Sequence, residues 1–472
     1  ALGAVVFRVK GVRGELFALL TLAITFVIGT IVVNTPLDGG QGVSLAAVPV
    51  PAIGPTPSST FYLLALAAAV ATLLIAWGIQ VSKFGAGLFA IHDDEDAAEV
   101  MGVPTYRYKL LAFAISCALA GVAGGIHALF LSYVTAGDVF TIAVPLTVVL
   151  MSVLGGTRHW AGPAIGAVAI TGLLYSFTAA DHAIAGKAAI GAILIASILF
   201  MPEGILERVQ RIWRRAPAVQ RRAVSTTTGT TAPTASTGSM ATPASPTPAH
   251  ATAPIGAAAA AAPGRAAASG DLLLRVRGLR KSFKGVHALA GVDVDVRRGE
   301  ILGLLGPNGS GKSTFINVVS GHYAASGGEI AFEGRRLDGL PAHRIAAAGI
   351  ARTYQIPRPF AHLSVLQNVA VATLFGGAVG DPAAAEKEAR TWLEFTGLQD
   401  KADARPDALN LHQRKFLELA RALASRPRLV LLDEVLCGLT PAEIDNAVAL
   451  IRRIREQGSS IVFVEHVMRA VM

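Results

Sequence analysis

Apolar stretches separated by short polar breaks fill residues 1–201, and this pattern limits the fold more than any other feature. A helix needs about 20 predominantly apolar residues to cross a bilayer. Membrane spans are predicted at 16–33, 61–80, 110–134, 140–155, 162–178 and 188–201. The first three reach the required length, whereas the last three are short or interrupted by glycine, so the total of six is open by one or two. With 52% hydrophobic and 15% charged residues, the chain is typical of a membrane protein rather than of a large soluble core.

The basic residues beside these runs predict an orientation. If the N-terminus is cytoplasmic, alternating spans place a large basic set inside: Arg8, Lys10, Arg13, Lys83, Arg107, Lys109, Arg158, Arg208, Arg211, Arg214 and Arg215. The outer loops keep Lys187, and loop 34–60 has neither Lys nor Arg. Such asymmetry follows the positive-inside rule, so we expect a multi-pass membrane protein with these basic loops in the cytoplasm. The net charge of +9 is thereby explained by basic residues that flank membrane spans. The expected partner of these residues is the lipid bilayer, and no nucleic-acid partner is expected.

A change in composition divides the chain into three parts. Residues 1–205 form the predicted transmembrane domain, and 206–270 contain a basic segment and an Ala/Pro/Ser/Thr-rich linker that we expect to be disordered. Residues 271–472 alternate strand-like segments such as "LLLRVRGL", "RLVLLDEV" and "SSIVFVEH" with helical ones, which predicts an α/β domain. Ala1 is not an initiator Met, and Met472 ends inside a helical-looking segment, so we expect both ends to be truncated. Cys117 and Cys437 occur in unrelated contexts and are expected to be reduced.

The strongest chemical motif is "GPNGSGKST", directly after the apolar segment "ILGLL". It fits G-x-x-x-x-G-K-[ST], the P-loop, in which backbone N–H groups surround phosphates. Its residues are Gly306, Pro307, Asn308, Gly309, Ser310, Gly311, Lys312, Ser313 and Thr314. We expect Lys312 to reach the β- and γ-phosphates of ATP and the Ser313 hydroxyl to bind Mg²⁺.

Two carboxylates end the apolar strand "LVLLDE" about 120 residues later. Beside a P-loop, Asp433 is predicted to hold Mg²⁺ and Glu434 to polarise the attacking water. An acidic pair can also simply begin a loop.

In this combination, residues 271–472 resemble the nucleotide-binding domain of ABC transporters. The resemblance implies that Phe283 stacks on adenine, that Gln355 in "ARTYQIPRPF" is the Q-loop glutamine sensing Mg²⁺, and that His466 contacts the γ-phosphate. Gly438, Leu439 and Thr440 resemble the D-loop. Bland alternatives remain for each: a core phenylalanine, a surface glutamine and a helix-capping histidine.

The wording of "GIARTYQIPRPF" is similar to ATPase subunits of bacterial high-affinity branched-chain amino acid uptake systems. Independently, segments such as "GELFALLTLA" and "VLGGTRHWAGPAIGA" resemble the permease subunit of those systems over nearly all of 1–205. The resemblance implies a fusion of permease and ATPase that imports branched-chain amino acids, with ATP and Mg²⁺ as cofactors. It also implies three partners: a second permease, a second ATPase and an extracytoplasmic solute-binding protein. Urea, short amides and other amino acids stay open as substrates.

Segment 93–102, "DDEDAAEVMG", has two interpretations. By charge it is a solvated acidic loop. By resemblance it is a short coupling helix lying in a cleft of the ATPase near the Q-loop, with Asp93, Asp94, Glu95 and Asp96 at its start and Ala97 and Ala98 on its apolar side. An acidic start suits the dipole of such a helix.

The segment "DALNLHQRKFLELARAL", from Asp407 to Leu423, occupies the place of the family's L-S-G-G-Q signature. The aligned residues are Leu409, Asn410, Leu411, His412 and Gln413. We expect them to face ATP bound to the opposite subunit, although a solvated helix end is the alternative. Glycine lets a phosphate come close to its backbone, whereas the side chain of His412 prevents this approach. We therefore expect this segment to bind ATP weakly and the two ATPase domains of the transporter to be different chains.

Further departures concern the end of the chain. A full ATPase of this family continues beyond His466, Thr440 replaces the usual Asn or Asp, and Val467 follows the histidine where Asp is common. Rival interpretations are an exporter, a non-transport ABC ATPase with a membrane anchor, and two reading frames joined by a sequencing error.

Overall fold

The computed structural model describes residues 2–8, 15–36, 41–50, 53–157, 159–179, 191–192, 204–206, 208, 272–377 and 379–465. Three predictions therefore lie outside the described residues: the span at 188–201, nearly all of the linker, and the position of His466. Both cysteines are free, as predicted.

Long apolar helices make up the N-terminal half. Its helices are α1 (Leu2–Val6), α2 (Glu15–Val33), α3 (Pro57–Val81), α4 (Lys83–Asp93), α5 (Glu95–Val100), α6 (Thr105–Leu131), α7 (Ala136–Val139), α8 (Ala143–Gly155) and α9 (Gly162–Ala179). Within the described residues, four helical segments are long and apolar enough to cross a membrane: Leu16–Val33, Pro57–Gln80, Thr105–Leu131 and Ala136–Gly155. A shorter apolar helix covers Gly162–Ser176, in agreement with the short span predicted there.

Three spans differ from the prediction, and local capping decides the bounds of two of them. The span predicted at 140–155 begins at Ala136 and covers 20 residues, so the prediction that it is short is wrong. The span predicted at 61–80 begins at Pro57, since the Thr56 and Ser59 side chains form a capping box that starts α3 there. The span predicted at 110–134 is shifted to Thr105–Leu131. Ser132 ends α6 in the left-handed conformation, with φ of 61°, and a short strand follows.

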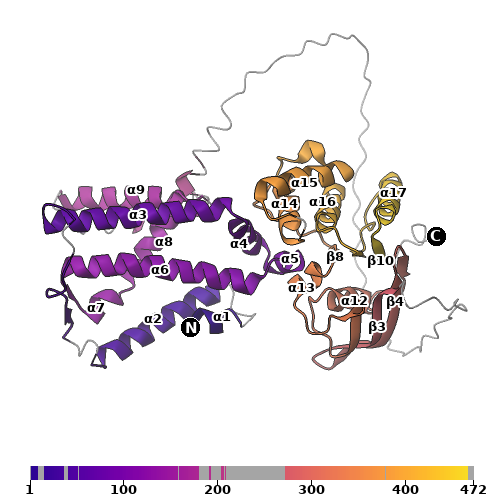
Figure 1. Cartoon of the computed structure of the whole chain (residues 1–472), viewed down its shortest axis with the longest axis horizontal. Helices are drawn as coiled ribbons and strands as arrows, with labels where there is room; N and C mark the ends of the chain where they lie inside the picture. The colour runs from indigo at the N-terminus through magenta and orange to yellow at the C-terminus, as the bar shows by residue number, and fades with distance from the viewer. Residues whose placement is uncertain are drawn as a thin grey trace, which may run out of the picture.

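The two ends of this helical half are different (Figure 1). At the end away from the C-terminal half, β1 (Val43–Ser44) pairs antiparallel with β2 (Tyr133–Val134). At the other end, α4 and α5 project from α3 and α6 toward the C-terminal half. Helices α8 and α9 pack at backbone distance, because a Cβ at Gly155 would lie 1.8 Å from the Gly162 carbonyl oxygen.

The C-terminal half contains two sheets. A parallel sheet has the order β5 (Ile301–Leu304), β10 (Ser460–Val464), β9 (Leu429–Asp433), β8 (Ile350–Arg352). An antiparallel sheet has the order β4 (Val286–Arg297), β3 (Leu272–Phe283), β6 (Gly327–Phe332), β7 (Arg335–Arg336). The strands β9 and β10 are buried along their whole length, as expected for apolar runs of a covered parallel sheet.

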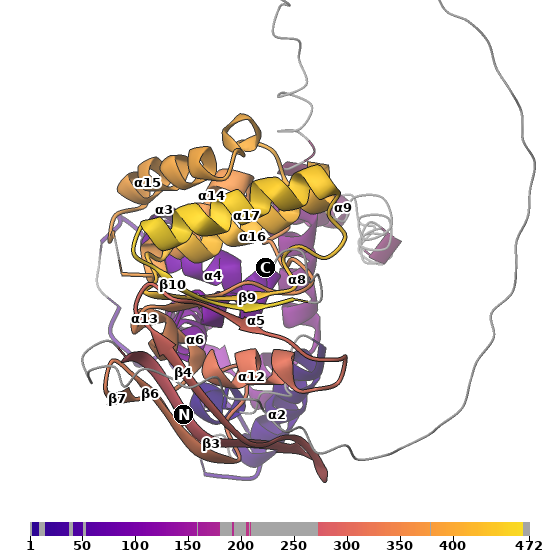
Figure 2. The same ribbon diagram turned by 90° about the vertical axis from the view of Figure 1, so that its right-hand side faces the viewer.

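Helices complete this half in two groups. Figure 2 shows α12 between the two sheets and a helical layer over the other side of the parallel sheet. The helices are α12 (Lys312–Val319), α13 (Ala342–Ala347), α14 (Val365–Phe375), α15 (Pro382–Phe395), α16 (Leu411–Ala424) and α17 (Pro441–Glu456), with the short 3₁₀ turns η1 (Gln399–Lys401) and η2 (Pro406–Ala408). One buried apolar cluster packs the helices α14, α15, α16 and α17 against the parallel sheet. A second cluster packs α12 against both sheets. The predicted fold class, a helical membrane bundle followed by an α/β P-loop domain, is confirmed.

Candidate functional site

The P-loop lies between β5 and α12, as its sequence context predicts. Gly306, Gly309 and Gly311 have φ values of 158°, 83° and 90°. These values allow the backbone to curl, and a Cβ on Gly311 would lie 2.6 Å from the Ala288 carbonyl oxygen. The Lys312 ammonium donates to the carbonyl oxygens of Gly306 and Pro307 at 2.7 and 2.8 Å, so the lysine lies along the loop that it serves.

The carboxylates at the end of β9 meet this loop. Ser313 Oγ donates to Asp433 Oδ1 at 3.4 Å, and Gln355 Nε2 donates to Glu434 Oε2 at 2.6 Å. A cavity of about 690 Å³ opens among them, lined by Asn308, Gly309, Ser313, Gln355, Glu434 and Cys437. Five sequence-predicted site residues from three separate segments are thus brought to one cavity: Asn308, Gly309, Ser313, Gln355 and Glu434.

Asp433 is held in a mixed environment. It is 3% exposed, and this burial raises the pKa of its carboxyl above the ordinary value, while the Arg352 guanidinium opposes the rise. Arg352 is itself fixed by hydrogen bonds to Asn317 Oδ1 at 2.6 Å and Ser320 Oγ at 3.0 Å. A hydroxyl, a carboxylate and an amide side by side form the oxygen-rich set that Mg²⁺ prefers, so Ser313, Asp433 and Gln355 fit the predicted ion.

Glu434 occupies a tight turn directly after β9. Its φ is +49°, a conformation that non-glycine residues rarely adopt and that occurs at functional sites. Lys415, from α16, donates its ammonium to the carbonyl oxygens of Glu434, at 3.1 Å, and of Cys437. Burial lowers the pKa of Lys415, and the two carbonyl oxygens receive a charged donor inside the fold. Lys415 therefore stabilises the turn that presents Glu434.

Phe283 lies at the end of β3, outside the residues that line the cavity. It is 38% exposed, packs edge-to-face against Tyr323 at 5.1 Å, and has the Lys281 ammonium 4.7 Å from its ring centroid. The bland alternative of a core phenylalanine is wrong. The ring is partly exposed at the end of β3, and adenine stacking stays a prediction.

The five signature residues surround the start of α16. Asn410 is the N-cap, and it forms a reciprocal capping box with Gln413, with N–H···O distances of 2.8 and 3.1 Å. Leu409 is buried and Leu411 is 51% exposed. His412 packs on Phe416 at 4.3 Å between ring centroids, and its Nδ1 lies 3.4 Å from Glu443 Oε1. The polar cluster at this helix end is therefore an ordered cap, and Leu411 is its most exposed apolar group.

The D-loop residues Gly438, Leu439 and Thr440 lead into α17. Gly438 has φ of 78°, and Thr440 caps the helix through a box with Glu443, whose carboxylate accepts from the Thr440 amide and hydroxyl at 2.8 Å each. These bonds lower the pKa of Glu443. Threonine and asparagine both serve as N-caps, which explains why Thr440 is tolerated at this position.

The predicted coupling helix is shorter than segment 93–102. Asp93 ends α4, and Asp94 is an extended N-cap whose side chain accepts from the Ala97 amide at 2.9 Å, so the helix itself is Glu95–Val100. The physical reason is the Asp94 cap, which needs a non-helical backbone and breaks the run of acidic residues. Gly102, with φ of +98°, ends the turn against the Phe375 backbone, where a Cβ would lie 2.8 Å from its carbonyl oxygen.

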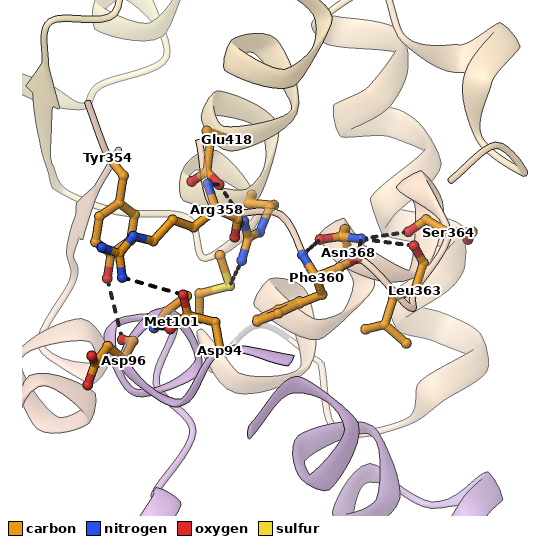
Figure 3. Close-up of polar contacts among 12 residues, drawn as sticks. Asp94, Asp96, Met101, Tyr354, Arg358, Phe360, Leu363, Ser364, Asn368 and Glu418 are labelled. Atoms are coloured by element: carbon orange, nitrogen blue, oxygen red, sulfur yellow. Dashed lines mark hydrogen bonds and ion pairs between the residues drawn. The ribbon is translucent and has the colours of Figure 1, made fainter. Parts of the chain in front are cut away.

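This segment is seated in the C-terminal half rather than in solvent. Ala97 and Ala98 are 0% exposed and share an apolar cluster with Phe360, Leu374 and Phe375. The solvated-loop interpretation is therefore wrong. Polar contacts surround the cluster, as Figure 3 shows in part. The pairs are Tyr354 Oη to the Asp96 carbonyl oxygen (3.4 Å), Arg358 Nη1 to Asp94 Oδ2 (3.5 Å), the His362 amide to Asp93 Oδ2 (2.9 Å), Arg421 Nη2 to Met101 Sδ (3.2 Å), and His343 Nδ1 to Glu99 Oε1 (3.6 Å).

A buried ion pair on α16 links this junction to the signature helix. Arg421 Nη1 bonds Glu418 Oε1 at 2.5 Å, and the same carboxylate oxygen accepts from the Arg358 amide at 2.8 Å. Arg421 also donates to the Arg358 carbonyl oxygen at 2.7 Å. Both side chains of the pair are almost fully buried. The backbone of Arg358, three residues after Gln355, is thus gripped from both sides by α16.

Asn368 orders the rest of the socket, by which we mean the surface of residues 354–375 that contacts α5 and its flanking residues. It is 0% exposed, accepts from the Phe360 amide at 2.8 Å, and donates to the carbonyl oxygens of Phe360, Leu363 and Ser364 (Figure 3). The loop between the Q-loop and α14 therefore has a defined shape although it has no regular secondary structure.

Sequence reasoning missed Lys415, Glu418, Arg421 and Asn368. No sequence signal pointed to three of them, because Lys415, Glu418 and Arg421 lie on the polar side of the amphipathic helix, away from the stripe of Phe416, Leu419 and Leu423. In the fold that polar side is buried as well, and its charges have partners. Tyr354 was also missed. Burial raises its pKa to about 12, so its hydroxyl stays a donor toward Asp96.

Comparison with known proteins agrees with both halves. Residues 1–199 match the family profile described as "Branched-chain amino acid transport system / permease component", and residues 289–436 match that of the "ABC transporter". Among curated relatives, the chain is similar to the high-affinity branched-chain amino acid transport ATP-binding proteins BraF of Pseudomonas aeruginosa and LivG of Escherichia coli K12. Each is 36% identical over 214 residues, which cover 42% of this chain and 84% of the relative. A ribose import ATP-binding protein of Rubrobacter xylanophilus is 38% identical over 197 residues, 41% of this chain and 39% of that protein.

Among solved structures, the chain is similar to a nucleotide-free ATP-binding cassette from an ABC transporter, with 28% identity and a TM-score of 0.39. The similarity covers 42% of this chain and 83% of that one.

A P-loop cavity with Glu434 in its wall and Asp433 behind Ser313, joined to a membrane-spanning helical domain, defines a membrane transport ATPase. The chain belongs to the ABC transporter family, and it combines a permease domain with the ATP-hydrolysing domain that drives transport.

Proposed function

We propose that this chain forms half of an importer for branched-chain amino acids in the bacterial cytoplasmic membrane. Support comes independently from its two halves, because the permease region matches a profile of that transport system and the ATPase region is similar to proteins of the same system. The observation that carries the proposal is the seating of α5 in the ATPase. One chain thereby contains both the permease domain and the ATPase domain, and the two are in contact through α5.

The chemistry follows from the cavity. ATP phosphates lie along the P-loop residues 306–314, with Lys312 at the β- and γ-phosphates and Phe283 against the adenine. Glu434 orients and polarises the attacking water, and His466 contacts the γ-phosphate. Ser313, Asp433 and Gln355 hold Mg²⁺, which when bound neutralises charge on the phosphates. The hydrogen bond from Gln355 to Glu434 joins the residue that reports nucleotide to the residue that hydrolyses it.

Transmission to the membrane uses the same segment. Gln355 lies three residues before Arg358, and Arg358 is held by Glu418 and Arg421 while its guanidinium reaches Asp94. Movement of the Q-loop or of α16 therefore displaces the socket of α5. The permease then changes its access from one side of the membrane to the other.

The working complex requires partners. We infer a second permease, a second ATPase and an extracytoplasmic solute-binding protein, with ATP held between the P-loop of one ATPase and the signature of the other. In this chain the signature has Asn410 and His412, so the partner's ATP faces a weaker grip, and the second ATPase is a different chain with its own signature.

Transport in vesicles tests the substrate. The full chain with its partner subunits and binding protein is reconstituted, and ATP-dependent uptake of labelled leucine is compared with labelled urea and a short amide. Leucine uptake supports the proposal, and preference for urea or amides moves the substrate class. ATP-dependent uptake without any binding protein, or efflux of preloaded solute, contradicts import of this kind.

A further inference from the structure

Two imidazoles and a carboxylate meet where the permease touches the ATPase. His92 is in the last turn of α4, Asp93 ends that helix, and His362 lies in the loop before α14. One potential ligand atom from each residue lies within 4.8 Å of the other two. The two histidine rings have centroids 5.9 Å apart and both are exposed, so an ion has access from solvent.

The Asp93 carboxylate prepares one of these rings. Its side chain is 3% exposed, and it contacts both the amide and Nδ1 of His362. A carboxylate at Nδ1 favours a proton on that nitrogen, which leaves the lone pair of Nε2 for a ligand. Metal-bound histidines commonly have this arrangement, in which the second ring nitrogen donates to a carboxylate that fixes the ring.

The contact between His362 and Asp93 does not account for the position of His92. That pair already joins the two halves, yet His92 brings a second imidazole to the same point. Imidazole ligands suit Zn²⁺, Cu²⁺ and Ni²⁺, whereas Mg²⁺ and Ca²⁺ prefer oxygen ligands.

We propose that His92, Asp93 and His362 form a binding site for an imidazole-preferring divalent transition-metal ion that ties the permease to the ATPase. The two imidazoles are the ligands, His92 from the permease and His362 from the ATPase, and Asp93 orients the His362 ring. A bound ion selects the arrangement in which they are close. We infer that α4 also shifts against the loop before α14 during the cycle, so an ion that ties the two together acts as a brake on turnover. This site is separate from the ATP cavity and goes beyond the proposed function.

Binding is tested with Co²⁺, whose visible absorption reports its ligands. The full chain with its partner subunits, in lipid nanodiscs, is titrated with Co²⁺, and Zn²⁺ is then added as a competitor. We expect an absorption band of nitrogen-coordinated Co²⁺ that Zn²⁺ removes, that is lost in His92→Ala and in His362→Ala, and that is retained in His159→Ala. His159 is a matched control in the permease, where its Nδ1 accepts from the Ala161 amide. A band of equal intensity in His92→Ala and the parent overturns the site, as does a spectrum of fully hydrated Co²⁺.

The brake is tested by ATP hydrolysis with and without Zn²⁺, expressed as a ratio so that different basal rates cancel. We expect Zn²⁺ to slow the parent by about fivefold or more, within the usual range of coupling between sites. The ratio should return to that of untreated protein in His92→Ala and stay low in His159→Ala. Equal inhibition of His92→Ala and the parent overturns the brake. Neither measurement depends on which solute is transported. Failure of the metal-site proposal is therefore distinguishable from failure of the substrate proposal.

Discussion

At the scale of single residues, the turn at Glu434 shows how a charged side chain, that of Lys415, can support a site without lining its cavity. Glu434 is held with positive φ after a fully buried strand, and its amide donates to the Val464 carbonyl oxygen at 3.0 Å. Gln355 contacts the carboxylate from one side, and Lys415 holds the backbone from another. The position of Glu434, the predicted base, is therefore determined by three separate elements.

Glu434→Gln should retain ATP binding and lose turnover by about 10²-fold or more, because the amide cannot accept the proton of the attacking water. Turnover is measured by phosphate release and binding by a fluorescent ATP analogue. The isosteric change keeps the turn intact, so a loss of binding would indicate misfolding instead. Equal hydrolysis by mutant and parent would remove Glu434 as the base.

Lys415→Met should slow hydrolysis by about tenfold with ATP binding retained. The change removes a charged donor from two carbonyl oxygens, each such bond contributing about 1.5–3 kcal/mol, and lets the Glu434 turn relax. Arg414→Met is the matched control, since the neighbouring Arg414 donates instead to Pro406 and Asp407. Phosphate release is compared at saturating ATP. If both variants slow hydrolysis equally, the effect belongs to α16 in general and not to the turn.

Motifs with a fixed chemistry were predictable at this scale, and tertiary partners were not. The P-loop and the Asp433–Glu434 pair are local patterns whose spacing forces a shape. The contact of Lys415 with Glu434 depends instead on how α16 packs against the end of β9, and no local pattern encodes it. Lys415 lies at the polar side of α16, so neither its burial nor the identity of its acceptors could be predicted without the fold.

At the scale of elements, the coupling segment illustrates how capping overrides a broad prediction. Its position and apolar alanines were foreseen, but its start at Glu95 follows from Asp94 acting as the cap. The socket that receives it has a comparable origin. A loop without regular structure is shaped by Asn368, whose buried side chain makes one accepted and three donated hydrogen bonds.

Asn368→Ala should reduce transport more than ATP hydrolysis. Loss of the side chain leaves the Phe360 amide and several carbonyl oxygens without their partner, at about 1–3 kcal/mol for each unsatisfied buried group. The loop that contacts α5 is then free to move without carrying the helix. The measurement is the number of ATP molecules hydrolysed per solute imported.

Gln367→Ala is the appropriate comparison for that variant. Gln367 is exposed and caps α14 together with Ser364, so its loss weakens a helix end by about 1 kcal/mol but leaves the loop bonds in place. We expect its coupling ratio to match the parent. A ratio that is unchanged in Asn368→Ala as well would show that the loop does not transmit motion.

At the scale of the whole molecule, α16 connects the Glu434 turn to the socket of α5. Its Lys415 contacts that turn and its Arg421 contacts Met101 after α5, while the predicted signature residues lie at its N-terminus. A partner's ATP that presses on the signature would therefore push on a helix connected to both. In that case the grip of the signature sets how strongly one ATP site influences the other.

The pair of changes Asn410→Ser and His412→Gly tests this asymmetry. In the chain without a partner ATPase, both ATP sites of a pair face the weak signature, so basal hydrolysis should be low. The double variant restores a small residue and a hydroxyl cap at the helix start, which allows closer approach of a phosphate to the backbone N–H groups. We expect hydrolysis to rise by about tenfold, because each 1.4 kcal/mol of added transition-state binding gives that factor. Phosphate release by the purified full chain provides the measurement. Adding Glu434→Gln to the double variant should abolish the gain. A parent chain that hydrolyses ATP alone as fast as the double variant would show that Asn410 and His412 form an effective signature, and that two copies of this chain suffice.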